Sequence, residues 1–234
     1  MKSDIEGSTP EDLARPGDES ARGQANKDWR CYTIGHSSHP IEHFIQLLKR
    51  HGIDCVVDVR SWPHSTHAAQ FDRERLSSKL TEHSISYTYL GDRLGGMYTD
   101  PKLLFPDGKV NYAKVRKTKR FKEGIRKLIS KINHGRRVAI MCAEKDPFDC
   151  HRFVLISYQL TKHDVQVDHI LDDGSVISNE ALEEKLLKRY KRNSTQATLL
   201  GPPPSKTHAL DAAYIARNID ISQSCYERSG APKA

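Results

Sequence analysis

The sequence predicts an α/β protein in which helices cover both faces of a mainly parallel sheet of about five strands, a three-layer α/β/α arrangement. Short apolar runs alternate with longer segments in which apolar residues recur every three or four positions, patterns typical of buried strands and amphipathic helices. Strands that alternate with helices favour right-handed crossovers and therefore parallel pairing. Polar residues follow three of the apolar runs, and sites in such sheets form at the carboxyl ends of strands.

The first two strands and the helix between them follow from the local pattern. Residues 31–34 form the first expected strand, which ends in a Gly-His-Ser-Ser turn. Pro40 suits the first turn of a helix whose apolar stripe runs from Ile41 to Leu48, and Gly52 favours its end. Residues 55–59 form the second strand, an apolar run that ends at an Arg-Ser-Trp-Pro turn.

The remaining elements continue the alternation of strands and helices. Apolar residues at Leu76 and Leu80 indicate a helix, and residues 86–90 a third strand. An irregular stretch follows from Met97 to about Thr118, a length typical of functional loops. The later elements are a helix at 121–132, a strand at 137–141, a helix from 150 to about 161, a strand at 165–171 and a final helix around 182–187.

Composition divides the chain into three parts. Residues 1–29 are polar and lack apolar periodicity, which indicates a disordered leader. Residues 30–192 hold all the expected strands and form the α/β domain. The composition of residues 193–234 indicates a polar, largely flexible tail. A stiff Gly-Pro-Pro-Pro run interrupts it. Residues 209–219 could form a short helix, but no sequence feature requires that helix to pack on the domain.

Cysteine usage and hydropathy set the expected compartment. The chain has 5 cysteines in no regular framework, no apolar run long enough to cross a bilayer and no secretory signal. These features favour reduced thiols, so we expect a cytoplasmic protein with no membrane partner. The turn after the first strand lacks the Gly-x-Gly-x-x-Gly fingerprint of dinucleotide sites. The cofactor and the oligomeric state stay unknown at this point.

Positive charge is concentrated in residues 109–137, which we call the basic segment. It contains 12 Lys or Arg and one acidic residue, Glu123, within a chain of net charge +7. Such a block attracts phosphates, so an anionic small molecule or a nucleic acid is the expected partner. The alternative is a solvated helix face. Only Tyr112 and Phe121 supply aromatic rings there, fewer than a stacking groove for single strands would need.

The turn between the fourth strand and the next helix carries the strongest candidates for chemistry. Either Cys142 or Cys150 could be a nucleophile activated by an imidazole such as His36 or His151. A helix start near Cys150 would stabilise its thiolate. The alternative is that small cysteines fill a tight junction between strand and helix. For Cys31 and Cys55, which lie inside apolar strands, packing is the preferred interpretation.

Charged residues around these thiols suggest further roles. Glu144 is the candidate acid or base, or else a helix cap or a partner of Arg152. Arg60 and Arg152 could grip a phosphate or carboxylate, or else pair with Asp58 and Glu144. Asp58 is expected to orient a histidine or an arginine.

Two glycines and a possible metal site complete the candidates. Gly95 and Gly96 could let backbone N–H groups approach an anion, or could form a tight turn. Cys142, Cys150 and His151, with His36, include suitable zinc ligands, although their spacing is not that of structural zinc sites. We therefore assign no metal ligand and keep a metal site as an alternative.

These motifs together resemble the DUF488 family, a group of proteins of uncharacterised function. The matching pieces, in family order between about Tyr32 and Leu171, are Thr33-Ile34-Gly35-His36-Ser37, Val57-Asp58-Val59-Arg60-Ser61-Trp62-Pro63, Leu94-Gly95-Gly96, Met141-Cys142-Ala143-Glu144 and Cys150-His151-Arg152. The resemblance implies a Rossmann-like α/β domain with these motifs gathered in one site, and it implies no established reaction. It marks as family positions Gly35, His36, Ser37, Asp58, Arg60, Pro63, Cys142, Glu144, Cys150, His151 and Arg152.

The sequence thus favours an enzyme that acts by hydrolysis or group transfer on a phosphorylated, nucleotide-like or nucleic-acid substrate. Its expected catalytic residues are Cys142, Glu144, His36 and Cys150. Its expected substrate-binding residues are Arg60, Arg152, Ser37, Gly35, Asp58, His151, Gly95 and Gly96. The alternatives are a non-catalytic nucleic-acid-binding protein that uses the basic segment, and a metal-dependent enzyme with cysteine and histidine ligands.

Overall fold

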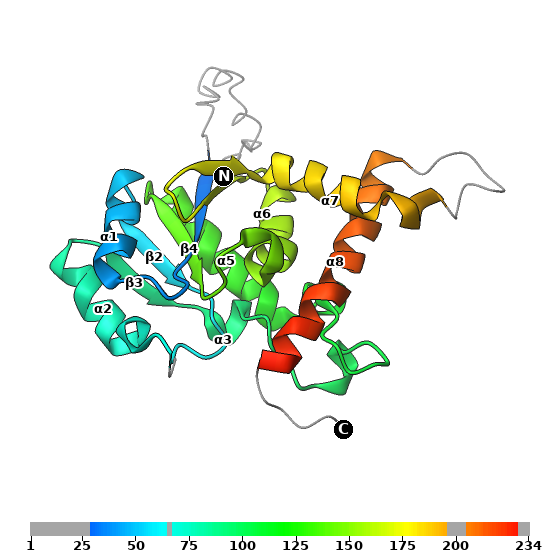
Figure 1. Ribbon diagram of the computed structural model, residues 1–234, viewed down its shortest axis with the longest axis horizontal. Helices are drawn as coiled ribbons and strands as arrows, with labels where there is room; N and C mark the ends of the chain where they lie inside the picture. The colour runs from blue at the N-terminus through cyan, green and yellow to red at the C-terminus, as the bar shows by residue number, and fades with distance from the viewer. Residues whose placement is uncertain (1–28, 65–66, 196–204, 229–234) are drawn as a thin grey trace, which may run out of the picture.

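The computed structural model describes residues 29–64, 67–195 and 205–228 (Figure 1). The expected leader lies outside this range except for Trp29, and so does the Gly-Pro-Pro-Pro run. Within the described part of the chain, no helix combines the length and the apolar character needed to cross a membrane.

A six-stranded sheet in the order β3-β2-β4-β1-β5-β6 forms the centre of the fold. Its strands are β1 (Arg30–Gly35), β2 (Cys55–Asp58), β3 (Ser86–Tyr89), β4 (Val138–Cys142), β5 (Gln166–Ile170) and β6 (Val176–Ser178). The first five strands pair in parallel, and β6 pairs antiparallel with β5. The central strand β4 is buried along its whole length, because parallel sheets are covered on both faces.

Helices cover both faces, so the predicted three-layer α/β fold is confirmed. On one side lie α1 (Ile41–Arg50) and α2 (Arg73–Glu82), and on the other α5 (Lys119–Asn133), α6 (Tyr158–Thr161) and α8 (Lys206–Arg228) (Figure 1). Helix α7 (Asn179–Thr195) contacts β5, β6 and α8. The short elements are η1 (Ala69–Phe71), α3 (Gly91–Leu94), η2 (Pro101–Leu103), α4 (Tyr112–Val115), η3 (Pro147–Asp149) and η4 (Arg152–Ser157).

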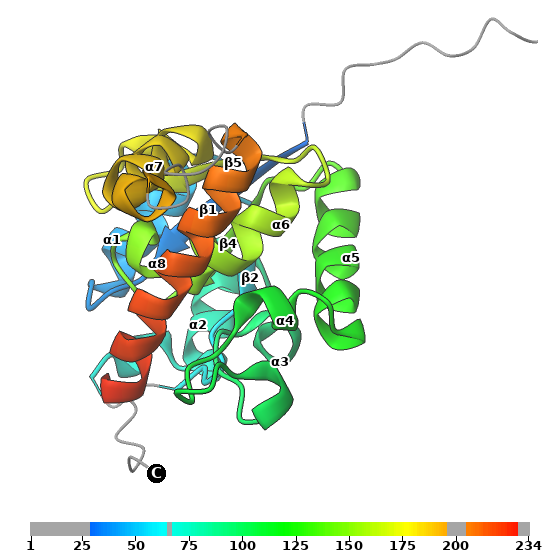
Figure 2. The same ribbon diagram turned by 90° about the vertical axis from the view of Figure 1, so that its right-hand side faces the viewer.

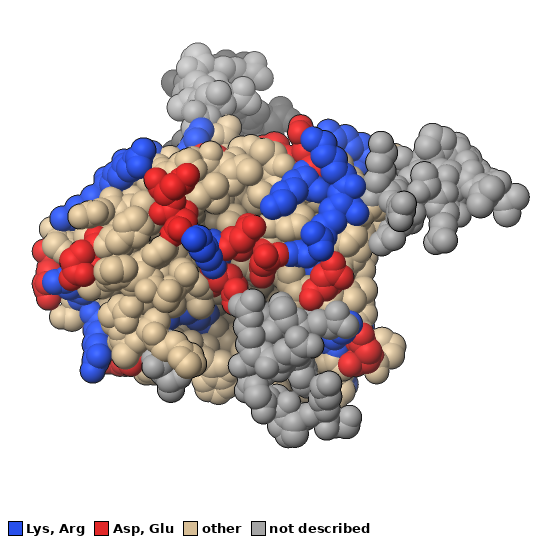
Figure 3. Space-filling model, viewed as in Figure 1, with Lys and Arg blue, Asp and Glu red and all other residues tan. Residues whose placement is uncertain are grey.

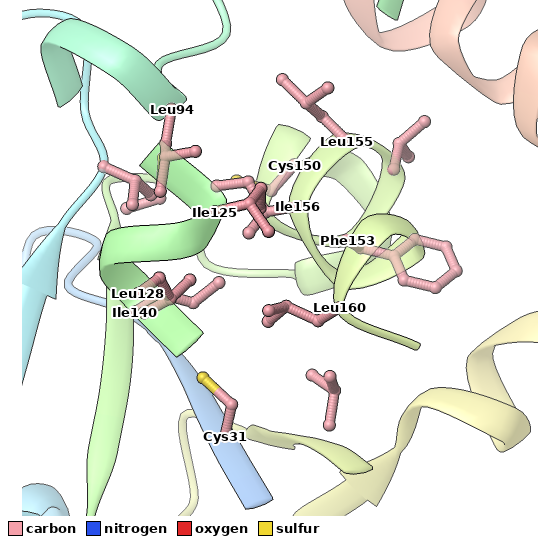
Figure 4. Close-up of a cluster of buried hydrophobic side chains, with 14 of the residues drawn as sticks. Cys31, Leu94, Ile125, Leu128, Ile140, Cys150, Phe153, Leu155, Ile156 and Leu160 are labelled. Atoms are coloured by element: carbon pink, nitrogen blue, oxygen red, sulfur yellow. The ribbon is translucent and has the colours of Figure 1, made fainter. Parts of the chain in front are cut away.

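The sheet separates two apolar cores, because alternate residues of a strand point to opposite faces. Tyr32 and Ile34 of β1 pack with side chains of α1 and α2. Cys31 of the same strand packs on the other side with α5 and η4, as part of the larger core (Figure 4). Cys31 and Cys55 are both buried in this core, as expected for packing residues, and burial raises the pKa of the Cys31 thiol to about 12.

The stretch from Met97 to Thr118, expected to be irregular, contains two capped helical pieces. The side chain of Asp100 accepts a hydrogen bond from the backbone N–H of Lys102 at the start of η2. The side chain of Asn111 does the same for Lys114 at the start of α4. Local side-chain caps thus stabilise short helices that apolar periodicity cannot reveal.

Helix α8 lies within the part of the chain expected to be a largely flexible tail, and it packs on the domain. The side-chain oxygen of Asn218 accepts the backbone N–H of Tyr112 at 2.8 Å, and its nitrogen donates to the Val110 carbonyl at 2.9 Å. Arg217 donates through Nε to the Phe148 carbonyl at 3.0 Å. Apolar side chains of α8 are also buried in the larger core, namely those of Ala213, Tyr214 and Ile221. The short helix expected within 209–219 is thus part of a longer one that packs through both apolar and polar side chains.

Candidate active site

The carboxyl ends of β2, β4 and β1 lie side by side and carry the candidate residues. Gly35 of β1 pairs with Cys142 of β4, and Asp58 of β2 pairs with Met141 of β4. Just beyond β1, the backbone N–H of His36 donates to the Cys142 carbonyl at 2.9 Å. The three polar strand ends that the sequence analysis expected to converge therefore meet at one edge of the sheet.

The turn after β1 is pressed against the loop that follows β4. A Cβ atom on Gly35 would lie 1.9 Å from the Glu144 carbonyl oxygen, so only glycine fits. Ser37 adopts a φ of 49°, in the left-handed region, and its N–H donates to the Ala143 carbonyl at 2.9 Å. Gly35 and Ser37, both expected to bind substrate, thus shape the site through their backbones.

Cys142, Cys150 and His151 form a buried group that we call the thiol–imidazole cluster. Each sulfur lies 3.7 Å from Nδ1 of His151. Nε2 of the same ring lies 3.1 Å from the carbonyl oxygen of Val59. Because a carbonyl only accepts, Nε2 carries a hydrogen and Nδ1 is the nitrogen that faces the sulfurs. His151, named beforehand as one of two possible activating imidazoles, holds that position.

Of the two thiols in the cluster, Cys150 is the one whose pKa is lowered. Burial raises the pKa of this thiol, but a hydrogen bond from Cys142 and the nearby charges of Arg152 and His151 lower it more, so it falls well below its ordinary value. The pKa of Cys142 is raised, first by its hydrogen bond to Cys150 and then by burial. The backbone N–H of Arg152 also donates to the Cys150 sulfur at 3.5 Å. The backbone around Cys150 therefore stabilises a thiolate.

The helix after the cluster begins later and in a different form than expected. Cys150 is extended, with φ −128° and ψ 146°, and its carbonyl accepts the N–H groups of Phe153 and Val154. The first full turn, η4, is π-helical rather than α-helical. Such turns within helices occur frequently at functional sites.

Arg60 is engaged by the protein rather than open to an anion. It donates to the Asp58 carboxylate through Nε at 3.0 Å and Nη2 at 2.7 Å, and Nη2 also reaches the Phe71 carbonyl at 2.8 Å. The Tyr87 hydroxyl donates to Asp58 as well, at 2.7 Å. The ion pair between Arg60 and Asp58, which the sequence analysis kept as the alternative to anion binding, is the arrangement found.

His36, expected to handle protons, has both ring nitrogens occupied. Its Nδ1 donates to the Ser37 carbonyl at 2.7 Å, and its Nε2 accepts from Nη1 of Arg60 at 3.1 Å. Burial, and next the charge of Arg60, lower the pKa of His36 to about 4. A neutral imidazole that accepts from a guanidinium is a poor proton acceptor, so this geometry does not favour the expected role of His36 in proton transfer.

Arg152, expected to bind an anion, instead holds the loop after β4. Its guanidinium donates to the Glu144 carbonyl at 2.6 Å and to the Lys145 carbonyl at 2.9 Å. The residue is fully buried. Because these two bonds use its terminal nitrogens inside the protein, the guanidinium shapes the loop and supplies positive charge beside Cys150.

Glu144 lies on the loop after β4, where its backbone forms a hydrogen bond with the Cys142 thiol. Its half-buried side chain lines a pocket of about 600 Å³ with Asp146, Asp172 and Lys185, among others. Acidic side chains are visible near the middle of the face in Figure 3, beside the Lys and Arg of α7. Among the described residues, the group within ligand distance of the two sulfurs does not include the Glu144 carboxylate. The Glu144 side chain thus belongs to the lining of this pocket.

Gly95 and Gly96 allow close packing against the cluster. A Cβ atom on Gly96 would lie 2.9 Å from Cγ of His151, and one on Gly95 would lie 2.4 Å from Oγ of Ser61. The Ser61 hydroxyl in turn accepts the backbone N–H of Met97 at 3.1 Å. Gly96 therefore lets the His151 ring approach the backbone, and Gly95 forms a close turn against Ser61 and Gly91.

Three contributors to the site were missed by the sequence analysis. The Val59 carbonyl fixes His151, the Tyr87 hydroxyl binds Asp58, and the Phe71 ring stacks on His36 with centroids 4.3 Å apart. A backbone carbonyl has no sequence signal. Asp58 pairs with Tyr89 on the neighbouring strand, and Tyr87 lies two residues before Tyr89, so the predicted strand pairing could have suggested it.

A search against protein families matched residues 40–159, about half of the chain, to the family described as Domain of unknown function DUF488. The match includes the Asp58–Arg60 turn and the thiol–imidazole cluster, while His36 precedes it. No curated protein and no solved structure matches the chain.

Proposed function

The chain belongs to the DUF488 family, and from the thiol–imidazole cluster we propose that it is a cysteine-dependent hydrolase or group-transfer enzyme. The observation that carries this proposal is the 3.7 Å distance from each of the sulfurs of Cys142 and Cys150 to Nδ1 of His151. A thiol beside an imidazole is the arrangement that activates a cysteine nucleophile. Packing alone would not require the Val59 carbonyl to turn Nδ1 toward the sulfurs.

In this proposal Cys150 is the nucleophile and His151 carries the proton. The Cys150 proton passes to Nδ1 of His151, and the sulfur forms a bond to the electrophilic atom of the substrate. The leaving group departs with its bonding electron pair and takes the proton from His151. Water, or an acceptor hydroxyl in group transfer, then gives a proton to His151 and attacks the same atom. The bond to sulfur breaks, and His151 returns the proton to the cysteine pair.

The surrounding residues support this chemistry without exchanging protons or forming bonds with the substrate. Cys142 donates a hydrogen bond to the Cys150 sulfur, and Arg152 offsets its negative charge. Asp58 and Arg60 hold the strand ends that carry His36 and Val59. Glu144 takes no part in the proposed proton transfers, because its carboxylate lies outside the cluster.

The proposed substrate is phosphorylated, nucleotide-like or a nucleic acid. Support comes from the net charge of +7 rather than from Arg60 and Arg152, which are engaged internally. The proposed location is the cytoplasm. Four described cysteines are free thiols, which suits a reducing compartment.

Alkylation of the thiols at different pH values tests the proposal without a known substrate. Native protein is treated with iodoacetamide, and labelled peptides are quantified by mass spectrometry. We expect Cys150 to be labelled with a midpoint below the ordinary thiol pKa of about 8.5. His151→Ala should move that midpoint upward. Cys31 serves as an internal control of similar burial, because its raised pKa should keep it unlabelled at pH values where Cys150 reacts.

Two results would contradict a cysteine nucleophile. One is labelling of both cluster cysteines only above the ordinary thiol pKa. The other is an unchanged midpoint in His151→Ala, provided that thermal unfolding shows this variant to be folded. Once an activity is found, Cys150→Ser should abolish turnover, and Cys142→Ser should retain part of it.

A metal-dependent enzyme is the second candidate, because the same three residues fit a metal ion. Their ligand atoms lie within 4.8 Å of one another. Sulfur and nitrogen ligands at about 2.3 and 2.1 Å from one tetrahedral zinc ion would be about 3.6 Å apart, close to the observed sulfur-to-nitrogen distances. The bond from His151 to the Val59 carbonyl resembles the outer contact of metal-bound histidines.

Metal analysis of protein purified without chelator separates the two candidates. About one zinc per chain, lost in both Cys142→Ser and Cys150→Ser, would favour the metal. In that case alkylation of the cluster should also require prior chelation. Metal-free protein whose Cys150 is readily labelled would favour the thiolate.

A further inference from the structure

A pocket of about 760 Å³ lies between α4, α5, α6 and α8, the helices that face the viewer in Figure 2. We call it the basic pocket. Its charged lining residues are Arg116, Lys117, Lys122, Arg126, Lys162, His163 and Asp211. Helix α8 supplies one wall, so the pocket exists only because the supposed tail packs on the domain.

The cations of the basic pocket are poorly neutralised by the protein. None of its five Lys and Arg side chains forms an ion pair with another residue that the structure describes. Asp211, its acidic lining residue, already accepts the Tyr158 hydroxyl at 2.8 Å. Arg116 and Lys162 both lie over the Tyr158 ring, at 4.0 and 5.2 Å from its centre. Like charges are therefore crowded, and an anion would relieve their repulsion.

Apolar groups form part of the same lining. Phe121 and Ile125 are buried, and Ile215 of α8 is 41% exposed, one of the few large apolar side chains at the surface. A solvated helix face would spread its cations over a convex surface. Here cations from α5, α6 and their flanking turns surround a hollow that also offers apolar contact, which favours a binding site.

We propose that the basic pocket binds the phosphate backbone of a single-stranded nucleic acid. Lys122, Arg126 and Lys162 are exposed and contact phosphates, and Ile215 packs against sugar or base. Both rings that the basic segment offered for stacking, Tyr112 and Phe121, are buried, so the affinity comes mainly from charge and not from base stacking. This binding is independent of the thiol chemistry, because the pocket is built from other residues.

The surroundings of the pocket favour a strand over a free nucleotide. Lys119, Arg120 and Lys127 of α5 are exposed and do not line it, so positive charge continues beyond its rim. A polymer can use that extension, whereas one nucleotide cannot. A flexible strand can also enter a hollow of this size, whereas a rigid duplex would span it.

Fluorescence anisotropy with a short labelled oligodeoxythymidine tests the proposal. If the three side chains of Lys122, Arg126 and Lys162 contact phosphates, log K should fall against log salt with a slope of about −2.1, which is about a twentyfold loss between about 50 and 200 mM salt. Lys122→Gln/Arg126→Gln should weaken binding and reduce the slope by about 1.4. The matched control is Lys49→Gln/Arg75→Gln, which removes the same charge from exposed positions on α1 and α2.

Several outcomes would overturn the proposal. They are no binding at low salt, equal losses in the two double variants, or tighter binding of a duplex of the same length. Binding to vesicles containing phosphatidylserine but not to the oligonucleotide would also overturn it. Circular dichroism confirms that each variant is folded, and all four substituted side chains are exposed, so folding should be unchanged.

Discussion

Replacing Asp58 by alanine should destabilise the protein strongly, because it leaves a buried cation without its partner. The Asp58 carboxylate is fully buried and accepts hydrogen bonds from Arg60 and Tyr87. Burial lowers the pKa of Arg60, but the bonds to Asp58 raise it more, so the net shift is upward. In Asp58→Ala the guanidinium, only 5% exposed, keeps the Phe71 carbonyl and His36 as neutral partners.

The size of the effect follows from these contacts. Removing one member of a buried ion pair costs about 3–5 kcal/mol, and the unpaired Tyr87 hydroxyl adds about 1 kcal/mol. We therefore expect a loss of about 4 kcal/mol or more. Asp58→Ala/Arg60→Met should recover much of this loss, because it also removes the buried charge and leaves an apolar side chain of similar length.

Urea denaturation at fixed pH and salt, followed by circular dichroism, measures these free energies of unfolding. Asp168→Ala is the matched control, since it breaks the ion pair with Arg30, a side chain that is 43% exposed, and should cost at most about 1 kcal/mol. A loss in Asp58→Ala no larger than in this control would refute the reasoning. So would a double variant that is less stable than Asp58→Ala.

Three further predictions concern single residues. The pKa of His36 is about 4 in the folded protein and about 6.5 in the unfolded chain. Between these two pH values the unfolded chain binds more protons than the folded protein. The free energy of unfolding therefore falls as the pH drops from about 6.5 to about 4. Urea denaturation gives the free energy of unfolding at about pH 7 and about pH 5. The drop between these two values should be about 2 kcal/mol smaller in His36→Asn than in the wild type, and an equal drop in both proteins would contradict the assignment. Asn218→Ala should lower the free energy of unfolding by about 2 kcal/mol in the same assay, because the buried backbone groups of Val110 and Tyr112 lose their hydrogen-bond partner. An unchanged urea midpoint would mean that α8 does not stabilise the loop that carries Val110. Gly96→Ala should displace the imidazole next to it and shift alkylation of the cysteine thiolate to higher pH, whereas unaltered labelling would show that the ring does not set the thiol pKa.

Local patterns were enough to predict the layers of the fold and the edge of the sheet that carries the site. The apolar run at 138–142 reads as a buried strand because parallel strands are covered on both faces. Once the strands are parallel, Gly35, Asp58 and Cys142 must end at one edge, whatever the length of chain between them. Side chains around them could therefore be gathered into one site from the sequence alone.

Tertiary structure decided which of these side chains face one another. Residue type allowed Arg60 and Arg152 either to bind a ligand or to bond internally, and burial together with nearby carbonyls selected the second. It also selected His151 over His36 as the imidazole beside the thiols, through a contact with the Val59 backbone. Backbone carbonyls are identical in every residue, so no sequence pattern reports where they accept a hydrogen bond.

Helix α8 is a second case in which the sequence predicted an element and the tertiary structure decided its contacts. A short helix was expected there, but on its packed face the buried Arg217 and Asn218 separate the apolar Tyr214 and Ile221, so periodicity did not indicate that it packs. The sequence by itself determined the α/β layers, the polar edge and the pair of cysteines. The fold alone decided the hydrogen-bond partners, the wall of the basic pocket and the contact of both cysteines with His151, because these depend on distances between segments that the chain order leaves open.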